Sequence, residues 1–285
     1  MSAAAPPVDA AAICAGDVRT HDFGRYAATL FAAPAQRRAL LALQAFSGEV
    51  TRVRDHISQP LPGEIRLQWW SDTLAGAGHG GVEGHPVAAE LLAAMAAYDL
   101  AVVDLERIVE AHRFDLYDDA MPTMETLETY LRDTAATMFS LAARICGADA
   151  PEALAHHAGL AAGLVRVIAL LPVHAARRQL FLPQQLLDLN GVDSADVFAG
   201  KATPQLRTVL AYLGREASGH LDLALQALAA APRQLGPAFL ELALVARALR
   251  RIGQDDWDPF RPEASSRLAV LWTLWRATRR APWRG

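Results

Sequence analysis

Cysteine, lysine and long apolar runs are all scarce in this chain of 285 residues. The two cysteines, Cys14 and Cys146, are too few for a disulfide framework or a cysteine-based metal site, and they fit a reducing compartment. Lysine occurs once, at Lys201, whereas arginine is frequent, a bias typical of a GC-rich genome. The longest nearly apolar run, residues 158–173, is interrupted by Arg166 and is too short to predict a membrane span.

The charge balance argues against a nucleic-acid-binding protein, and the first residues argue against a secreted one. The net charge is −4 at pH 7, which predicts no binding of nucleic acid. The first residues lack the basic segment and apolar core of a secretory signal, and also the arginine-rich and serine-rich character of a transit peptide. We therefore expect a cytoplasmic protein, and the sequence leaves open whether its compartment is a bacterial cytoplasm or a mitochondrial matrix.

Helical periodicity dominates the chain after about residue 20. Between residues 127 and 145, apolar side chains recur every three or four positions, as on one face of a helix, and Gly147 closes the pattern. Apolar runs that alternate with period two, as strands require, are missing. Because 52% of the residues are hydrophobic, the chain can fill a large core. We therefore expect a loose, disordered leader over residues 1–20 and a single all-α domain over residues 21–285.

The sequence contains no nucleotide-binding loop, catalytic-triad motif, zinc spacing or glycine fingerprint, so candidate sites depend on clusters of charged residues. In EVTRVRD, Glu49 and Asp55 lie about 120° apart around a helix, with Arg52 between them. This spacing favours a carboxylate–arginine–carboxylate chain along the helix, or an ordinary salt bridge, over two carboxylates that bind one metal ion. In RLQWW, Arg66 precedes two adjacent tryptophans, of which at most one lies squarely on the core face.

The densest group of carboxylates in the chain is the DLYDD segment, in which Asp115, Asp118 and Asp119 are expected to share a helix face. Mg²⁺ prefers hard oxygen ligands of this kind. The segment lies just before Pro122, where a solvated helix end explains the same residues, and both interpretations stay open. The adjacent His156 and His157 face different ways, so no joint metal site is expected there.

Residues 153–187 contain no acidic residue at all. From residue 166 onward this stretch carries the basic residues Arg166, His174, Arg177 and Arg178. Together they could bind an anion such as a phosphate, or an acidic partner. Arg177 and Arg178 also suit the dipole at a helix C-terminus. Arg166 interrupts an apolar run and requires a carboxylate or an anion opposite, for which we expect Asp55 or Glu49.

The last twenty residues, 266–285, contain five arginines and no acidic residue. Trp272, Trp275 and Trp283 are interleaved with these arginines. The combination is typical of a segment that makes a peripheral contact with an anionic membrane or an acidic partner. A closing bundle helix with a solvated basic tail is the alternative.

Four segments together resemble the squalene/phytoene synthase family: residues 25–50, PGEIRLQWW, residues 126–147 and AARRQLFLP. The resemblance is strong from Arg25 to Pro183 and looser beyond it. It implies the isoprenoid synthase fold, an all-α bundle with a central cavity between its helices.

The enzymes of this family couple two prenyl diphosphates head to head, and two Asp-rich clusters on facing helices hold the Mg²⁺ ions that polarise the leaving groups. The resemblance places the first cluster at VRDHIS, where Asp55 alone remains of three expected acids, beside Arg54 and Ser58. It places the second cluster just before RQLFLP, where Leu170 and His174 replace two aspartates. Leucine cannot bind Mg²⁺ and histidine is a poor ligand for it, so neither a catalytic residue nor a cofactor is expected.

The segments AFSGEVTRVRD, RLQWW, HPVAAEL and RRQLFLP are most similar to the branch of this family that assists assembly of respiratory complex I. The resemblance implies a catalytically degenerate protein, peripheral on the inner membrane (on the matrix side in a eukaryote), that binds a complex I subunit or assembly intermediate, a lipid or an isoprenoid. Its expected binding residues are Glu49, Arg52, Asp55, Arg66, Arg166, His174, Arg177 and Arg178. Two alternatives stay open: a lipid carrier, and an active prenyl transferase whose Mg²⁺ is held by Asp55 with Asp115, Asp118 and Asp119.

Overall fold

The computed structural model describes residues 9–57, 59–77, 84–261 and 265–283. Every regular element in these ranges is helical, which confirms the predicted all-α fold. In chain order the α-helices are α1 (Ala10–His21), α2 (Phe23–Thr29), α3 (Pro34–Thr51), α4 (Pro60–Leu74), α5 (Pro86–Tyr98), α6 (Val102–Ala111), α7 (Met124–Leu131), α8 (Thr137–Ile145), α9 (Glu152–Ala169), α10 (Leu171–Ala176), α11 (Gln184–Leu189), α12 (Ser194–Phe198), α13 (Pro204–Ala230), α14 (Leu242–Ile252) and α15 (Arg267–Thr278). The shorter segments are the 3₁₀ turns η1 (Val53–His56), η2 (Phe114–Leu116) and η4 (Arg233–Phe239), and the π-helical segment η3 (Arg132–Ala136).

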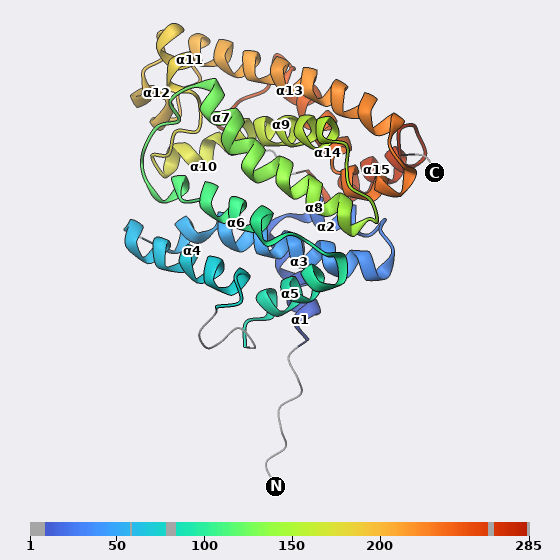
Figure 1. The fold of residues 1–285 in the computed structure, drawn as a ribbon. Helices are drawn as coiled ribbons and strands as arrows, with labels where there is room; N and C mark the ends of the chain where they lie inside the picture. Colours follow the sequence, from blue (N-terminus) through green and yellow to red (C-terminus); the bar gives the residue numbers. More distant parts are fainter. Residues whose placement is uncertain (1–8, 58, 78–83, 262–264, 284–285) are drawn as a thin grey trace.

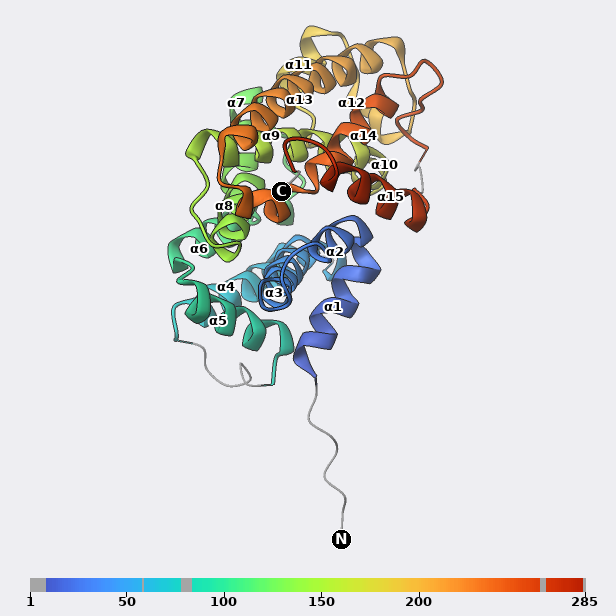
Figure 2. The same cartoon turned by 90° about the vertical axis from the view of Figure 1, so that its right-hand side faces the viewer.

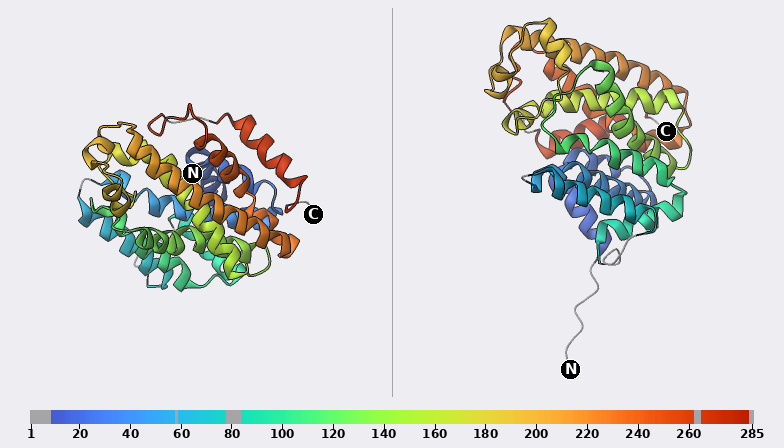
Figure 3. Two further views of the ribbon diagram at one scale, coloured as in Figure 1. Left: turned by 90° about the horizontal axis from the view of Figure 1, so that it is seen from above. Right: turned by 60° about the vertical axis from the view of Figure 1, so that its left-hand side comes forward.

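The helices form two layers that meet at α6 and α8 (Figure 1, Figure 3). One layer contains α1, α3, α4 and α5, and its apolar core includes Phe46 and Trp70, which pack edge to face with ring centroids 4.9 Å apart. The other layer contains α7 and α9 to α14 and has a core of its own. None of the described helices combines the length and the apolar character that crossing a bilayer requires.

Helix α1 occupies much of the segment for which the sequence predicts a loose leader, and for residues 10–20 that prediction is wrong. Asp9 caps the helix by accepting a hydrogen bond from the backbone N–H of Ala12 at 3.1 Å. Cys14 and Val18 are buried in the first-layer core. The apolar face of α1 is built largely from alanines and one cysteine, so its period is too weak to recognise in the sequence alone. Residues 1–8 lie outside the described part of the chain.

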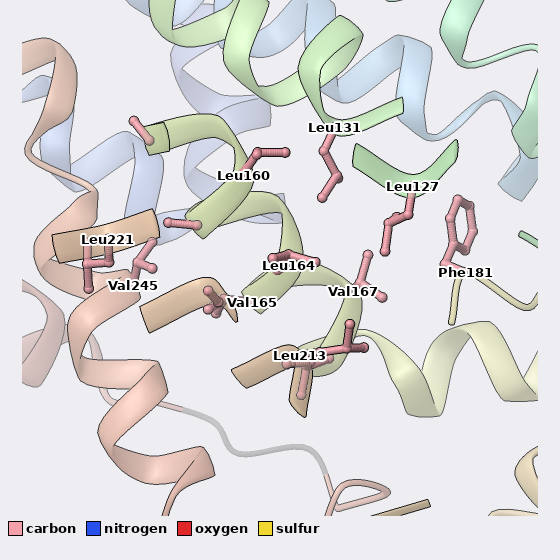
Figure 4. Close-up of a cluster of buried hydrophobic side chains, with 14 of the residues drawn as sticks. Leu127, Leu131, Leu160, Leu164, Val165, Val167, Phe181, Leu213, Leu221 and Val245 are labelled. Carbon is pink, nitrogen blue, oxygen red and sulfur yellow. The ribbon is translucent and has the colours of Figure 1, made fainter. Parts of the chain in front are cut away.

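The second layer is organised around the packing of α9 against α13. Figure 4 shows Leu164 and Val165 of α9 beside Leu213 of α13, with Val245 of α14 nearby. On its other side α9 comes very close to η3, because Gly159 presents no side chain there. A Cβ atom at Gly159 would lie 2.4 Å from the backbone N and Cα of Ala136, a distance that real structures do not show.

A third, smaller cluster joins α2, α14 and α15 at one edge of the molecule (Figure 2). Ala27 and Ala28 of α2 pack there against Val270, Leu274 and Ala277 of α15. Helix α2 therefore connects the C-terminal helix to the interior, because its Arg25 reaches the cavity described next.

Candidate functional site

A cavity of about 100 Å³ lies between the two layers and is lined by residues of α2, α3, α6, η2, α7, η3, α8, α9 and α10. One part of its wall is apolar and includes Ile108, Leu131 and Val167. The titratable side chains at the wall are Arg25, His112, Asp115, Tyr130, Arg166 and His174, and the hydroxyl groups of Ser47, Thr51 and Thr134 also line it. Ligand sites usually measure about 300 to 1,000 Å³, so a whole prenyl chain enters only if the helices separate.

The most connected polar group at the cavity is a buried cluster of His112, Asp115 and Tyr130. The Tyr130 O–H donates to Asp115 Oδ1 at 2.9 Å, and Asp115 Oδ2 lies 2.6 Å from His112 Nδ1, which must carry a proton there because the carboxylate only accepts. Gln179 donates its amide N–H to the backbone carbonyl of Asp115 at 2.9 Å. Burial, with the charge of Asp115, raises the pKa of Tyr130 well above its usual value, so the phenol stays protonated.

Arg166 lies at the junction of this cavity and a neighbouring cleft of about 170 Å³ next to α1 and α2. Its carboxylate partner is Asp22, at 3.6 Å, and the expected pairing with Asp55 or Glu49 is wrong. Asp22 lies at the junction of α1 and α2, directly after the segment for which the sequence predicts a loose leader, so the sequence gives no sign that it reaches Arg166. The side chain of Arg166 is 46% exposed. Desolvation by the surrounding protein, followed by repulsion from Arg25, lowers the pKa of Arg166 from its ordinary value.

Two partly buried groups lie next to Arg166, the Arg25–Glu241 pair and Gln44. Arg25 pairs with Glu241 at 3.3 Å, and burial raises the pKa of Glu241 from its ordinary value. Gln44, at the wall of the same cleft, has a buried side-chain oxygen with no hydrogen-bond partner among the described residues. A buried acceptor of this kind indicates a place for a water molecule or for a donor group of a ligand.

Asp55, the remaining acid of the first expected Asp-rich cluster, is not free. Its carboxylate lies 2.6 Å from Arg177, the residue that ends α10. The neighbouring Arg178 stacks its guanidinium over the ring of Phe198 at 5.0 Å. The positive charges of Arg177 and Arg178 are therefore each paired, with the carboxylate of Asp55 and with the ring of Phe198.

The carboxylate–arginine–carboxylate chain expected along one helix is also wrong, because α3 ends at Thr51 and its charged residues bind other elements. Arg52 pairs with Asp17 of α1 at 2.9 Å, and Glu49 lies 3.4 Å from His85 Nε2. Burial, followed by repulsion from Asp17, raises the pKa of Glu49 to about 7.

A second groove, of about 590 Å³, opens beside Glu49 and is lined by Arg52, Arg66 and Trp69. The prediction for the tryptophan pair is confirmed, because Trp70 is 1% exposed in the core whereas Trp69 is half-buried at the groove. The predicted site residues are thus distributed over two openings: Arg166 and His174 line the central cavity, whereas Glu49, Arg52 and Arg66 line this groove. The cleft of about 170 Å³ brings Arg52 and Arg166 together, because both line it.

The alternative magnesium site at Asp115, Asp118 and Asp119 is not assembled. The helical turn ends at Leu116, so the three side chains share no helix face. Asp115 points to His112 and Tyr130, whereas Asp118 pairs with Arg54 at 2.7 Å on the surface. In the ranges that the structure describes, no group of three or more His, Cys, Asp or Glu residues is placed to hold a metal ion.

The side chains at the expected positions of both clusters do not fit a magnesium site. Asp55 is paired with Arg177, Leu170 offers no donor atom, and His174 packs its ring on Phe181 with centroids 4.5 Å apart. Burial, with Arg166 and Arg177 nearby, lowers the pKa of His174 to about 4, so its imidazole is neutral at pH 7. A neutral imidazole and an arginine-bound carboxylate are poor ligands for Mg²⁺, which prefers free oxygen donors.

The fold and these motifs define a class of protein. The chain belongs to the squalene/phytoene synthase family, because its residues 18–276 match that family. Among solved structures, a dehydrosqualene synthase with a bound ligand shares the fold at a TM-score of 0.80 and 14% identity, with 95% of each chain covered. Squalene synthase HpnC from Alicyclobacillus acidocaldarius has a TM-score of 0.65 and 20% identity, with 95% of this chain and 93% of that chain covered.

Two kinds of relative are similar over most of the chain. Human NADH dehydrogenase (ubiquinone) complex I, assembly factor 6, is 29% identical over 260 residues, which cover 90% of this chain and 78% of the human protein. Its Drosophila melanogaster homologue is 27% identical, with 84% of this chain and 74% of the fly protein covered. Presqualene diphosphate synthase of Zymomonas mobilis is 26% identical over 252 residues, which cover 85% of this chain and 84% of that enzyme.

Proposed function

We propose that this protein is a non-catalytic member of the squalene/phytoene synthase family that assists assembly of respiratory complex I by binding a partner or a lipid. The observation that carries the proposal is the ion pair between Asp55 and Arg177, because it occupies the remaining carboxylate of the first expected cluster. Leu170 and His174 stand where the second cluster is expected, so no pair of facing carboxylates is available to hold a diphosphate through Mg²⁺. The similarity to complex I assembly factor 6 supports the assembly role.

The central cavity and its neighbouring cleft are the proposed binding site. Arg166 supplies a positive charge with one long contact, to Asp22 at 3.6 Å, and Gln44 supplies an unpartnered acceptor. An apolar wall that includes Ile108 and Leu131 continues from this polar end. The arrangement suits a ligand with an anionic head, a hydrogen-bond donor and a short apolar body, and it binds without requiring a metal ion.

A genetic test addresses the assembly role. Deletion of the gene in the source organism should lower the amount of assembled complex I and its NADH:ubiquinone activity, whereas carotenoid and hopanoid contents stay unchanged. A gene copy with Arg166→Gln should fail to restore complex I, and a copy with Arg132→Gln, which changes an exposed arginine on η3, should restore it. Normal complex I together with lost carotenoids in the deletion strain would contradict the proposal.

A second candidate, an active head-to-head prenyl transferase, has its support in the similarity to presqualene diphosphate synthase. Purified protein incubated with farnesyl diphosphate and Mg²⁺, with products analysed by mass spectrometry, distinguishes the two functions. We expect the substrate to be recovered unchanged. Formation of presqualene diphosphate would instead assign the enzyme activity and would require a metal site different from the two Asp-rich clusters that the family resemblance implies.

A further inference from the structure

Helix α15 has two apolar faces, and the protein covers one of them. Val270, Leu274 and Ala277 face inward and pack on α2 and α14. Leu268 and Trp272 lie on the opposite side and are 79% and 60% exposed. In soluble proteins a surface helix normally turns polar side chains toward water, so a second apolar face indicates a binding surface.

The exposed side chains form one continuous stripe. At 100° per residue, Leu268, Trp272 and Trp275 fall within an arc of about 60°, and Arg276 and Arg279 fall within about 60° of Trp272. The indole rings of Trp272 and Trp275 stack with centroids 5.0 Å apart, and the guanidinium of Arg279 lies over Trp275 at 4.8 Å. The stripe is therefore an organised surface in which cations border two aromatic rings.

The positive charge of this stripe indicates an anionic partner. Residues 265–283 contain four arginines and no acidic residue, although the whole chain has a net charge of −4. Tryptophan is the side chain that prefers the interface between lipid headgroups and acyl chains, and arginine is attracted to anionic headgroups. The outward face of an amphipathic surface helix can lie in the plane of a bilayer.

We propose that the outward face of α15, formed by Leu268, Trp272, Trp275, Arg276 and Arg279, docks the protein on the surface of an anionic membrane. The helix would lie parallel to the bilayer, with the two indoles at headgroup depth and the arginines on lipid phosphates. The inward face keeps its contacts with α2 and α14, so docking requires no unfolding. This docking does not depend on the role in complex I assembly and stands whether or not that role is correct.

Sedimentation with vesicles tests the proposal on the full-length chain. Vesicles of phosphatidylcholine with about 30% cardiolipin should bind the protein, and vesicles of pure phosphatidylcholine should bind it at least tenfold more weakly. Binding should weaken as salt concentration rises, because screening reduces the arginine contribution. The double variant Trp272→Ser/Trp275→Ser and the double variant Arg276→Gln/Arg279→Gln should each lose about tenfold in affinity or more.

Matched variants control for general effects of apolarity and charge. Leu189→Ser removes a side chain that is 75% exposed on α11, and Arg132→Gln/Arg215→Gln removes two exposed arginines on η3 and α13. Both should bind vesicles like the wild type, and circular dichroism should show that all variants are folded. Equal binding to neutral vesicles, or unchanged binding by both α15 variants, would overturn the proposal. It would also be overturned if no vesicle binds the protein while an acidic protein column retains it through the same residues.

Discussion

The carboxylate of Asp55 lies 2.6 Å from the guanidinium of Arg177 and joins the turn after α3 to the end of α10. These two residues lie on or next to the segments where the resemblance to the family implies two Asp-rich clusters. An arginine therefore occupies the space between the segments that two carboxylates and a divalent cation require. The proposed loss of catalysis is therefore supported by a specific ion pair, in addition to the missing aspartates.

This ion pair should contribute little to stability. The side chain of Asp55 is 26% exposed and that of Arg177 is 41% exposed, so Arg177→Gln should lower the free energy of unfolding by no more than about 1 kcal/mol. Arg25→Gln should cost about 3 to 5 kcal/mol, because it leaves Glu241 buried without its cation. Urea denaturation of both variants measures the contrast. Similar losses for the two variants would show that Asp55 and Arg177 have a structural role that their exposure does not explain.

Because α9 lies so close to η3, a single methyl group added at Gly159 should strongly destabilise the protein. Gly159→Ala would place a Cβ atom 2.4 Å from the backbone of Ala136, so one of the two helices must move. We expect a loss of about 3 kcal/mol or more, or failure to fold. The control is Gly219→Ala on α13, where a Cβ atom meets nothing within 4 Å. This variant should gain about 0.5 to 1 kcal/mol, since alanine favours a helix.

The buried cluster at the cavity predicts that the hydroxyl group of Tyr130 stabilises the folded protein. Tyr130→Phe removes the O–H that Asp115 accepts at 2.9 Å and leaves that buried carboxylate with one partner fewer. The cost should be about 1 to 3 kcal/mol. Tyr212→Phe, on the partly exposed side of α13, should change stability by less than about 0.5 kcal/mol. Equal effects of the two substitutions in a thermal or urea unfolding series would contradict the assignment of the cluster.

Glu49 predicts a pH dependence of stability. Its pKa rises from an ordinary 4.5 to about 7 in the folded protein. The folded state therefore holds a proton that the unfolded chain releases, and this group lowers the free energy of unfolding as pH rises from about 4.5 to 7. Glu49→Gln should be more stable than the wild type by about 1 to 2 kcal/mol at pH 8, and the difference should vanish near pH 4.

The matched control for the pH series is Glu106→Gln, a partly exposed carboxylate on α6. Its unfolding free energy should follow the wild type from pH 4 to 8. If Glu49→Gln also follows the wild type over this range, burial near Asp17 does not raise the pKa of Glu49 in the folded protein.

The sequence predicts the helical class, the helical stretch between residues 127 and 145 and the family, because these depend on local period and on short motifs. It does not predict the partners of the charged residues, since those depend on how distant helices meet. Arg166 illustrates the limit: its need for a carboxylate follows from the apolar run around it, but Asp22 comes from α1 and α2, where the alanine-rich pattern is weak. The pairing of His112 with Asp115 could have been predicted, because residues three apart are neighbours on a helical turn.

Magnesium binding provides the most direct test of the cavity. The wild type should show no change in melting temperature with about 10 mM Mg²⁺ and inorganic pyrophosphate, because Asp55 is paired and His174 is neutral. The variant Leu170→Asp/His174→Asp, which supplies two carboxylates one helical turn apart, should melt at a lower temperature without metal, since like charges then face a partly buried space. Mg²⁺ should raise its melting temperature by several degrees, and adding Arg177→Gln should enlarge that rise by releasing Asp55. A stabilisation of the wild type as large as that of the variants would show that the unmodified cavity already binds the ion, and the non-catalytic assignment would then fail.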